Sequence, residues 1–249
     1  MLEPERHQII LNLLKKQNTV KLQELVELTN SSESTIRRDL SQLEKQKLLK
    51  RVHGGAARLQ NMLQEPTMGE KSSKNVAEKR LIAKYAASLI EEGDSVYIDA
   101  GTTPFEMIPF LPSDIVVVTN GLMHVEALLS RNIKTFLLGG YVKPTTKALV
   151  GRSAIESLKN FRFDKCFMGV NGIHPDYGFT TPDPEEATVK QLAITLTRDA
   201  YVVADESKFS EVTFARIADL KDAIILTNAI DKEIQSQYER ETTIKVVSA

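Results

Sequence analysis

The chain has 249 residues, of which 42% are hydrophobic, and its formal net charge is −1 at pH 7. Because a domain usually holds roughly 100 to 200 residues, this length indicates two domains. The single cysteine, Cys166, excludes a disulfide framework, and the four histidines lack ligand spacing, so we expect no metal and no cofactor. No apolar run approaches the roughly 20 residues of a membrane span and no signal peptide is evident, which predicts a cytoplasmic protein without a membrane partner.

The charge is distributed unevenly along the chain. Residues 1–58 hold 11 Lys or Arg and 7 Asp or Glu, giving +4, so the remaining residues hold 21 and 26, giving −5. A basic segment in front of an acidic one predicts that the amino-terminal part approaches the phosphates of a nucleic acid.

Residues 4–45 predict three helices. The first covers residues 4–17 and offers paired Ile and Leu side chains to a small core. Leu22, Leu25, Val26 and Thr29 repeat at helical spacing before a Thr-Asn-Ser-Ser turn. Ser31 or Ser32 can cap a following helix, in which Ile36, Leu40 and Leu43 share one stripe. The predicted order is helix, turn, helix.

The opposite face of this last helix carries cations and hydroxyls suited to a DNA major groove, where Arg can read guanine. Residues 48–56 predict two strands around a glycine turn, a wing whose cations lie against phosphates or in a minor groove. An ordinary amphipathic helix pair with a solvated charged face is the alternative, but the turn, cap and wing in register favour DNA. The predicted DNA-binding residues are Ser34, Thr35, Arg37, Arg38, Ser41, Lys45, Lys50, Arg51 and His53.

We expect the DNA-binding domain in residues 1–57, a polar linker in residues 58–74 and a second domain in residues 75–249, which a helix from Asn75 opens. Short apolar strands then alternate with helices, which indicates an α/β fold with a mainly parallel sheet covered on both faces. The predicted strands are 95–99, 115–119, 135–138, 165–170, 201–204, 223–226 and 243–247. The predicted helices between them are 104–110, 122–130, 154–158 and 185–197.

Polar and glycine residues gather where the predicted strands end, and ligands bind beyond these ends in such sheets. The run Asp99–Pro104 follows the first strand and opens a helix, so its N–H groups, two Thr hydroxyls and the helix dipole suit a phosphate. Asp99 itself repels phosphate and is suited to sugar hydroxyls. Each such signal is weak alone, because every strand must turn, but several converge on one crevice. The other strand ends supply Asn120-Gly121, Gly139-Gly140 with Lys143, Asn171-Gly172, Thr180-Thr181 and Asp205–Lys208.

Together these motifs resemble the DeoR family of bacterial transcriptional regulators over nearly the whole chain. Within the family the sequence is most similar to the fructose operon repressors, through Val20–Leu25 and Gly178–Asp183. The family motifs are Ser34–Leu40, His53–Ala56, Asp99–Thr103, Val118–Asn120, Leu138–Gly140, Glu186–Lys190 and Asp205–Phe209.

The resemblance implies a winged helix-turn-helix domain joined to a sensor domain similar to ribose-5-phosphate isomerase. It implies a repressor, a homo-oligomer (dimer or tetramer), that leaves double-stranded operator DNA when a sugar phosphate binds, fructose 1-phosphate in this subfamily. Gly101, Thr102 and Thr103 then hold the phosphate. Asp99, Asn120, Glu186, Lys190 and Lys208 line the sugar end, and Gly139, Gly140 and Lys143 complete the predicted ligand-binding residues.

The similarity to the isomerases supplies an alternative function, the interconversion of an aldose and a ketose phosphate, which needs a general base beside the reacting carbon. The isomerases keep an Asp-Gly-Ala-Asp run and a lysine before a glycine row. Here Gly169–Gly172 and Tyr177–Thr180 lack both aspartates and the lysine, although Glu186 survives. We therefore expect binding without turnover and no catalytic residues. A purely architectural DNA-binding protein is a third possibility, and the second domain counts against it.

Overall fold

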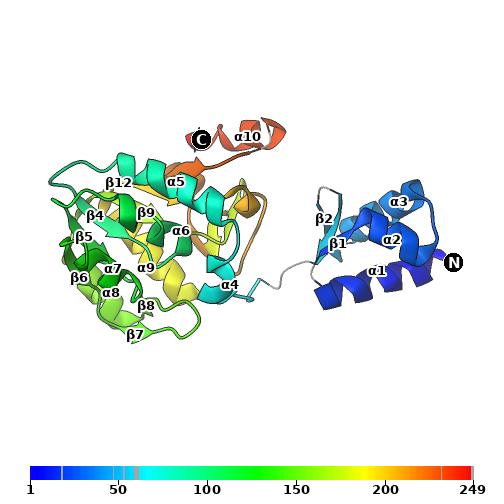
Figure 1. Cartoon of the computed structure of the whole chain (residues 1–249), viewed down its shortest axis with the longest axis horizontal. Coiled ribbons are helices and arrows are strands. Elements are labelled where there is room, and N and C mark those ends of the chain that lie inside the picture. The colour runs from blue at the N-terminus through cyan, green and yellow to red at the C-terminus, as the bar shows by residue number, and fades with distance from the viewer. Residues whose placement is uncertain (18, 47, 53, 59–61, 231, 248–249) are drawn as a thin grey trace. The chain divides into compact units, whose positions relative to one another are not determined.

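The computed structural model describes residues 1–17, 19–46, 48–52, 54–58, 62–230 and 232–247. The chain forms two compact units, residues 1–61 and residues 62–249 (Figure 1), and each is described by itself.

Unit 1 has the predicted order of helix, turn, helix and wing. Its three strands form an antiparallel sheet in the order β1-β3-β2. Ile10, Leu25, Ile36 and Leu40 are buried in one core that the helices and the sheet share. The elements are α1 (Glu3–Gln17), β1 (Thr19–Lys21), α2 (Leu22–Thr29), α3 (Glu33–Lys45), β2 (Leu49–Val52) and β3 (Gly55–Arg58).

Local chemistry fixes where α2 ends and α3 begins. Asn30 ends α2 in the left-handed conformation with φ 47°, which Asn tolerates better than most residues. Ser32 is the N-cap of α3, and its hydroxyl accepts a hydrogen bond from the Thr35 N–H at 3.3 Å. These two residues set the turn that presents the outer face of α3.

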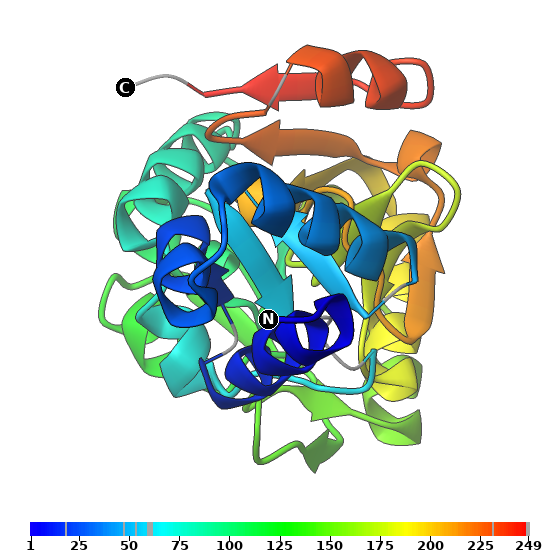
Figure 2. The ribbon, with the colours of Figure 1, turned by 90° about the vertical axis from the view of Figure 1, so that its right-hand side faces the viewer.

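Unit 2 is built on a parallel sheet of seven strands in the order β15-β14-β12-β9-β4-β5-β6. All seven predicted strands are members of this sheet, so the expected α/β class is confirmed. The strands are β4 (Ser95–Ile98), β5 (Val116–Thr119), β6 (Lys134–Leu137), β9 (Phe163–Met168), β12 (Thr197–Val203), β14 (Ile224–Thr227) and β15 (Ile244–Val246). Figure 2 shows β14 and β15 side by side at one edge.

Helices cover both faces of this sheet. Successive side chains of a strand point to opposite faces, so Val96 and Ile98 join the core under α5 whereas Tyr97 joins the core under α8 and α9. The helices are α4 (Met68–Ser72), α5 (Val76–Ser88), α6 (Thr102–Phe105), α7 (His124–Leu129), α8 (Arg152–Leu158), α9 (Pro184–Thr195) and α10 (Lys232–Tyr238). None of the described helices has the length and apolar character that a transmembrane span requires.

Several short elements were not predicted. One small antiparallel sheet contains β10 (Gly172–His174), β11 (Gly178–Thr181) and β13 (Ala215–Ala218), and β7 (Tyr141–Val142) pairs with β8 (Leu149–Val150). Three single 3₁₀ turns lie at Ile108–Phe110, Glu206–Lys208 and Leu220–Asp222. Runs of two to four residues are too short to show a periodicity, and β11 is buried throughout.

The predicted helix over residues 104–110 is two pieces. Helix α6 is one turn that begins at Thr102, so Pro104 is its third residue and not its first. The second piece is the 3₁₀ turn at Ile108–Phe110. Because Pro109 has no N–H to donate, an α-helix cannot continue undisturbed through it.

The predicted linker also differs from the structure, because residues 62–74 are part of unit 2. Thr67 and Glu70 form a capping box that starts α4. The Met68 N–H then donates to the Thr145 carbonyl at 3.1 Å. The polar composition that indicated a linker includes the capping residues of α4 and Glu65, which makes an ion pair with Lys143 of unit 2.

Candidate functional site

The outer face of α3 presents an arginine that is available to a partner. Arg38 is exposed and has no hydrogen-bond or ion-pair partner among the described residues. The hydroxyls of Ser34 and Thr35 lie 2.9 and 2.8 Å from that of Ser32 at the start of the helix. This end of α3 therefore offers one unpaired cation beside a group of hydroxyls.

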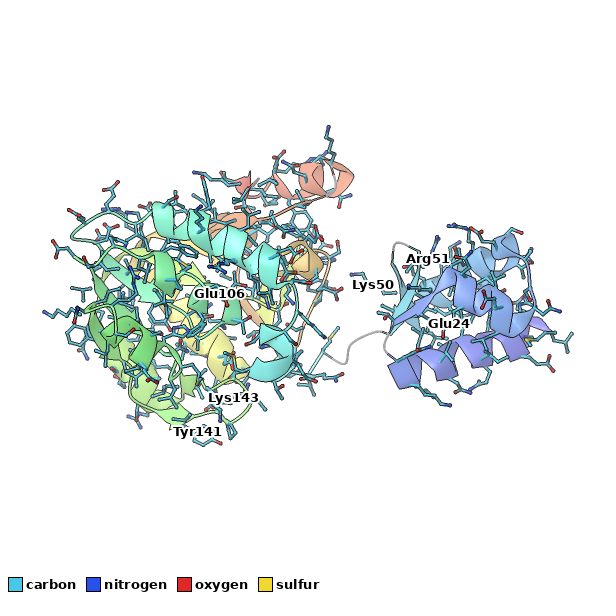
Figure 3. All side chains as sticks on the ribbon, in the orientation of Figure 1. Glu24, Lys50, Arg51, Glu106, Tyr141 and Lys143 are labelled. Atoms are coloured by element: carbon cyan, nitrogen blue, oxygen red, sulfur yellow. The ribbon has the colours of Figure 1, made fainter. Side chains whose placement is uncertain are left out.

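Other predicted DNA-binding residues are held by internal contacts. The Arg37 guanidinium pairs with Glu33 one turn earlier, with both side chains more than half exposed. Arg51 of β2 donates to the Ser41 hydroxyl at 2.9 Å, which ties the wing to α3. Figure 3 labels Lys50 and Arg51 on this wing strand.

Two other predicted DNA-binding residues lie on α3 and β2. Lys45 is exposed in the last turn of α3, and Lys50 is half-buried on β2. His53 lies outside the described residues.

The role of Asp39, the last residue of the Arg-Arg-Asp run, was not predicted. Its carboxylate is buried and accepts two hydrogen bonds from Arg6 of α1, at 2.7 Å from Nε and 3.0 Å from the terminal nitrogen. His7 Nε2 lies 3.5 Å from the same carboxylate. This bidentate contact fixes the rotation of α3 on α1, so that Arg38 faces outward while Asp39 faces inward.

In unit 2, a buried ion pair joins the end of β4 to α9. Lys190 Nζ lies 2.5 Å from Asp99 Oδ2, and the two side chains are 6% and 0% exposed. The same oxygen accepts the Gly169 N–H at 3.0 Å, whereas Asp99 Oδ1 has no hydrogen-bond partner among the described residues. Burial raises the pKa of Asp99. Burial alone would lower the pKa of Lys190, but Asp99 and Glu186 raise it overall.

Asn120, expected at the sugar end, instead braces the backbone. Its Oδ1 accepts the Ala100 N–H at 2.9 Å, and its Nδ2 donates to the Leu149 carbonyl at 3.4 Å. The side chain is 1% exposed. Asn120 therefore fixes the loop after β4, where Gly101–Thr103 lie, relative to the end of β5.

The predicted phosphate loop lies on the single turn of α6. The first N–H groups of a helix have no intrahelical partner, and the hydroxyls of Thr102 and Thr103 make no hydrogen bond to another described residue. His124 is buried below this loop, with its Nδ1 3.0 Å from the Thr119 hydroxyl. Burial lowers the pKa of His124 to about 4, which the Gly101 carbonyl only partly opposes, so the ring is neutral near pH 7.

Lys143 is the centre of a second group of charges. Its Nζ lies 2.7 Å from Asp183 and 3.2 Å from Glu186, and it also donates to Glu65. Burial alone would lower the pKa of Lys143, but hydrogen bonds to Asp183 and Glu65 raise it overall. The Thr146 hydroxyl donates to Glu186 at 2.7 Å. Figure 3 labels Lys143 and Tyr141, which belong to the segment around β7.

Not all predicted ligand residues belong to this arrangement. Gly139 and Gly140 are exposed after β6, and Gly140 has φ 129°, with a side chain there meeting the Val150 carbonyl at 2.5 Å. Its role is therefore a close backbone approach. Lys208 is half-buried in the Glu206–Lys208 turn, where it lowers the pKa of Lys79 in addition to the larger effect of burial.

The structure thus brings Asp99, Glu186, Lys190 and Lys143 into one network of charges, which we call the charged cluster. It also contains Glu65, Lys71, Thr146 and Asp183, which were not among the predicted ligand-binding residues. A proline after Asp183 marked a helix start there, but Glu65 and Lys71 carried no comparable signal. Among the described residues no group of His, Cys, Asp or Glu is arranged to hold a metal ion.

Comparisons with known proteins agree with this two-part description. Residues 6–62 match the DeoR-like helix-turn-helix domain, and residues 74–228 match the DeoR C terminal sensor domain. The chain is 53% identical to the HTH-type transcriptional regulator FruR of Bacillus subtilis, over 99% of both chains. It is 34% identical to the regulator GlpR of Haloferax volcanii, over 96% of this chain and 95% of the relative. It is 33% identical to the lactose phosphotransferase system repressor of Staphylococcus aureus, over 93% and 95%.

Solved structures resemble part of the chain only weakly. Ribose 5-phosphate isomerase A from Neisseria gonorrhoeae is 17% identical over 53% of each chain, with a TM-score of 0.40. The eIF2B beta subunit from Chaetomium thermophilum is 14% identical over 68% of this chain and 54% of that one, with a TM-score of 0.47. The matched part spans about half the length of these structures.

A winged helix with an arginine-bearing outer face, joined to a parallel α/β unit with charges at its strand ends, defines a two-domain transcriptional regulator. The matches to both family models and the near full-length relatives identify which one. The chain belongs to the DeoR family of transcriptional regulators.

Proposed function

We propose that this regulator represses a sugar-utilisation operon and leaves its operator when a phosphorylated sugar, fructose 1-phosphate, binds to unit 2. The observation that carries the proposal is the charged cluster, which contains the ammonium groups of the half-buried Lys143 and of the buried Lys190 and reaches Asp99 after strand β4. The identity to a relative named FruR supports fructose as the sugar. Such a protein acts in the cytoplasm, where its DNA lies.

DNA binding rests on the outer face of α3 and on the wing. Arg38 reaches the major groove without breaking an internal contact, so it is the residue we assign to base recognition. Arg37, Lys45, Lys50 and Arg51 contribute positive charge toward phosphates.

The phosphate of the effector is assigned to the start of α6. The N–H groups there and the hydroxyls of Thr102 and Thr103 supply uncharged hydrogen-bond donors for the phosphate oxygens. Lys190 and Glu186 then face the sugar, with Asp99 Oδ1 as an unused buried acceptor. We also assign Lys208, which is half-buried, to the sugar end.

Binding without turnover is the function that the charges support. Isomerisation needs a carboxylate that is free to take a proton, but Glu186 is held by Lys143 and Thr146, and Lys190 and Lys143 lower its pKa in spite of burial. Asn171, in the stretch comparable to the Asp-Gly-Ala-Asp run of the isomerases, accepts a hydrogen bond from the Thr181 hydroxyl at 3.1 Å. We therefore assign no catalytic residue.

The regulator acts as a homo-oligomer, a dimer or a tetramer, in this proposal. Winged helices paired by their second domains fit the half-sites of an operator. Exposed apolar side chains near the sheet edge at β6 support an association there: Phe136, Leu137, Tyr141 and Val142.

Calorimetric titration with fructose 1-phosphate, fructose 6-phosphate and tagatose phosphates tests the effector, and operator release by the best binder tests the regulation. A turnover assay on the same mixtures tests the isomerase alternative. Thr102→Ala should leave operator binding intact and impair release, because it removes one phosphate donor. A Thr102→Ala variant that is released normally would show that the phosphate lies elsewhere.

A further inference from the structure

Glu65 is an acid buried in the charged cluster although it lies between the two segments that match the family models. Its side chain is 7% exposed. One carboxylate oxygen accepts from Lys143, and the other lies 3.2 Å from Lys71 Nζ. A carboxylate is seldom buried without a cation to pair with it, so Glu65 is held in place by the same lysine that faces Glu186.

Residues 62–74, which we call the strap, bring Glu65 to this position. The strap also passes the predicted phosphate loop, because α4 packs against α6. Lys79 of α5 donates to the Lys71 carbonyl, and the Met68 N–H donates to the Thr145 carbonyl. Figure 1 shows α4 in the part of unit 2 where the chain arrives from unit 1. The strap is therefore both a lining of the ligand site and the covalent path to the DNA-binding unit.

The charge balance of the cluster leaves no room for another anion. Four carboxylates, those of Glu65, Asp99, Asp183 and Glu186, face three ammonium groups, those of Lys71, Lys143 and Lys190, giving −1. A phosphate that approaches Lys143 meets three carboxylates within 4 Å of the same nitrogen. Like charges this close repel strongly where solvent is largely excluded, so a carboxylate must leave before a phosphate can bind there.

Glu65 is the carboxylate that can leave. Asp183 is the N-cap of α9 and accepts the N–H groups of Glu185 and Glu186 at 2.8 and 3.1 Å. Glu186 belongs to α9 and is bound by Thr146. Glu65 lies on an irregular stretch before α4, outside any helix or strand, so its departure breaks no regular element.

We propose that Glu65 occupies an anion position of the effector site, and that the phosphate of the effector exchanges with it at Lys143 and frees the strap. This position replaces the start of α6 as the phosphate site, and the donors of Thr102 and Thr103 then face the sugar hydroxyls. This inference rests on the proposed function, since it concerns how a sugar phosphate enters the same site. The exchange links the two units, because the residue that is displaced belongs to the segment that leads to unit 1. Effector then binds the free-strap arrangement better than the closed one, which is what coupling requires.

Glu65→Gln in the full-length protein tests the exchange, because glutamine keeps the shape of the side chain and removes its charge. Glu92→Gln, at an exposed carboxylate after α5, is the matched control. We expect calorimetry to show that Glu65→Gln binds both fructose 1-phosphate and inorganic phosphate with a Kd at least roughly tenfold lower than that of the wild-type protein. The Kd values of Glu92→Gln should equal those of the wild-type protein. Glu65→Asp, which keeps the charge, should bind both probes more weakly than Glu65→Gln does.

Limited digestion with trypsin reports whether the strap is released, because the cleavage sites Lys71 and Lys74 lie within it. Either probe should speed cleavage after Lys71 in the wild-type protein. Unchanged affinity in Glu65→Gln, or a strap that the probes protect, overturns the inference. If fructose 1-phosphate fails to bind both proteins while inorganic phosphate shows the expected difference, the proposed effector is wrong and the exchange stands. If neither probe binds either protein, both proposals fail.

Discussion

Replacing Lys190 by methionine leaves the Asp99 carboxylate buried without a charged partner. This substitution isolates the effect of the charge, because methionine keeps most of the volume of the lysine side chain and removes its ammonium group. In the wild-type protein Lys190 Nζ lies 2.5 Å from Asp99 Oδ2, and the Asp99 side chain is fully buried. Water therefore cannot replace the lost ammonium group without a rearrangement of the strand end.

The expected loss can be bounded from the pKa of Asp99. Removing one partner of a buried pair typically costs about 3 to 5 kcal/mol of unfolding free energy. Asp99 can instead take up a proton, and from its ordinary pKa of 3.8 this costs about 4 kcal/mol at pH 7 and about 1.6 kcal/mol at pH 5. When folding raises the pKa of a carboxyl, the protein loses stability as the pH rises. The unfolding free energy of the variant should therefore be lower at pH 7 than at pH 5.

Guanidinium unfolding of the full-length protein at both pH values measures this difference, with the unit 2 transition compared between wild type and variant. The double variant Asp99→Asn with Lys190→Met is the control, because it removes both charges and should recover most of the stability. An equal loss at pH 5 and pH 7, or a double variant as unstable as the single one, would refute the reasoning.

Three further outcomes are expected. Arg38→Ala should weaken operator binding by roughly 1 to 3 kcal/mol in a binding titration and relax specificity at one base; an equal loss on random DNA would assign Arg38 to a phosphate. Asp39→Asn leaves Arg6 without its partner carboxylate and should lower the denaturant midpoint of unit 1 relative to the wild-type protein. His124, with a folded pKa of about 4 against an ordinary 6.5, should cost up to about 3 kcal/mol of stability as the pH falls from 6.5 to 4, and His124→Gln should abolish that dependence.

The sheet was predictable because each of its strands is an apolar run of its own. Val116–Thr119 and Phe163–Met168 are recognisable one at a time, and parallel order follows from the helices between them. The β7–β8 pair and the β10-β11-β13 sheet were not predictable, because they depend on contacts between segments that are too short to carry a pattern. The one-turn helix at Thr102 was partly predictable, but its end depended on Pro109.

Several residues of the charged cluster were predicted from the sequence, but the ion pairs that they form were not. Asp99 and Lys190 stand 91 positions apart, and Glu65 and Lys143 stand 78 apart. No spacing in the sequence links such pairs, which form only when the ends of the strands meet. For Asn120, the position at a strand end was predicted, but its partner was not: its side-chain oxygen accepts a hydrogen bond from the Ala100 N–H.

The two units differ in how their cations are held before a partner arrives, and this difference follows from burial. Arg38 is exposed and solvated, so DNA binding replaces water and counterions around it. Lys190 is buried and Lys143 is half-buried, and a bare ammonium group is costly in such places, so each is paired with a carboxylate of the same unit. A ligand that binds Lys143 or Lys190 must therefore exchange with an internal anion, whereas DNA meets a surface that is already formed. That contrast is what allows a small anion to move a segment of the chain, because the free energy of its binding is coupled to the release of an internal group.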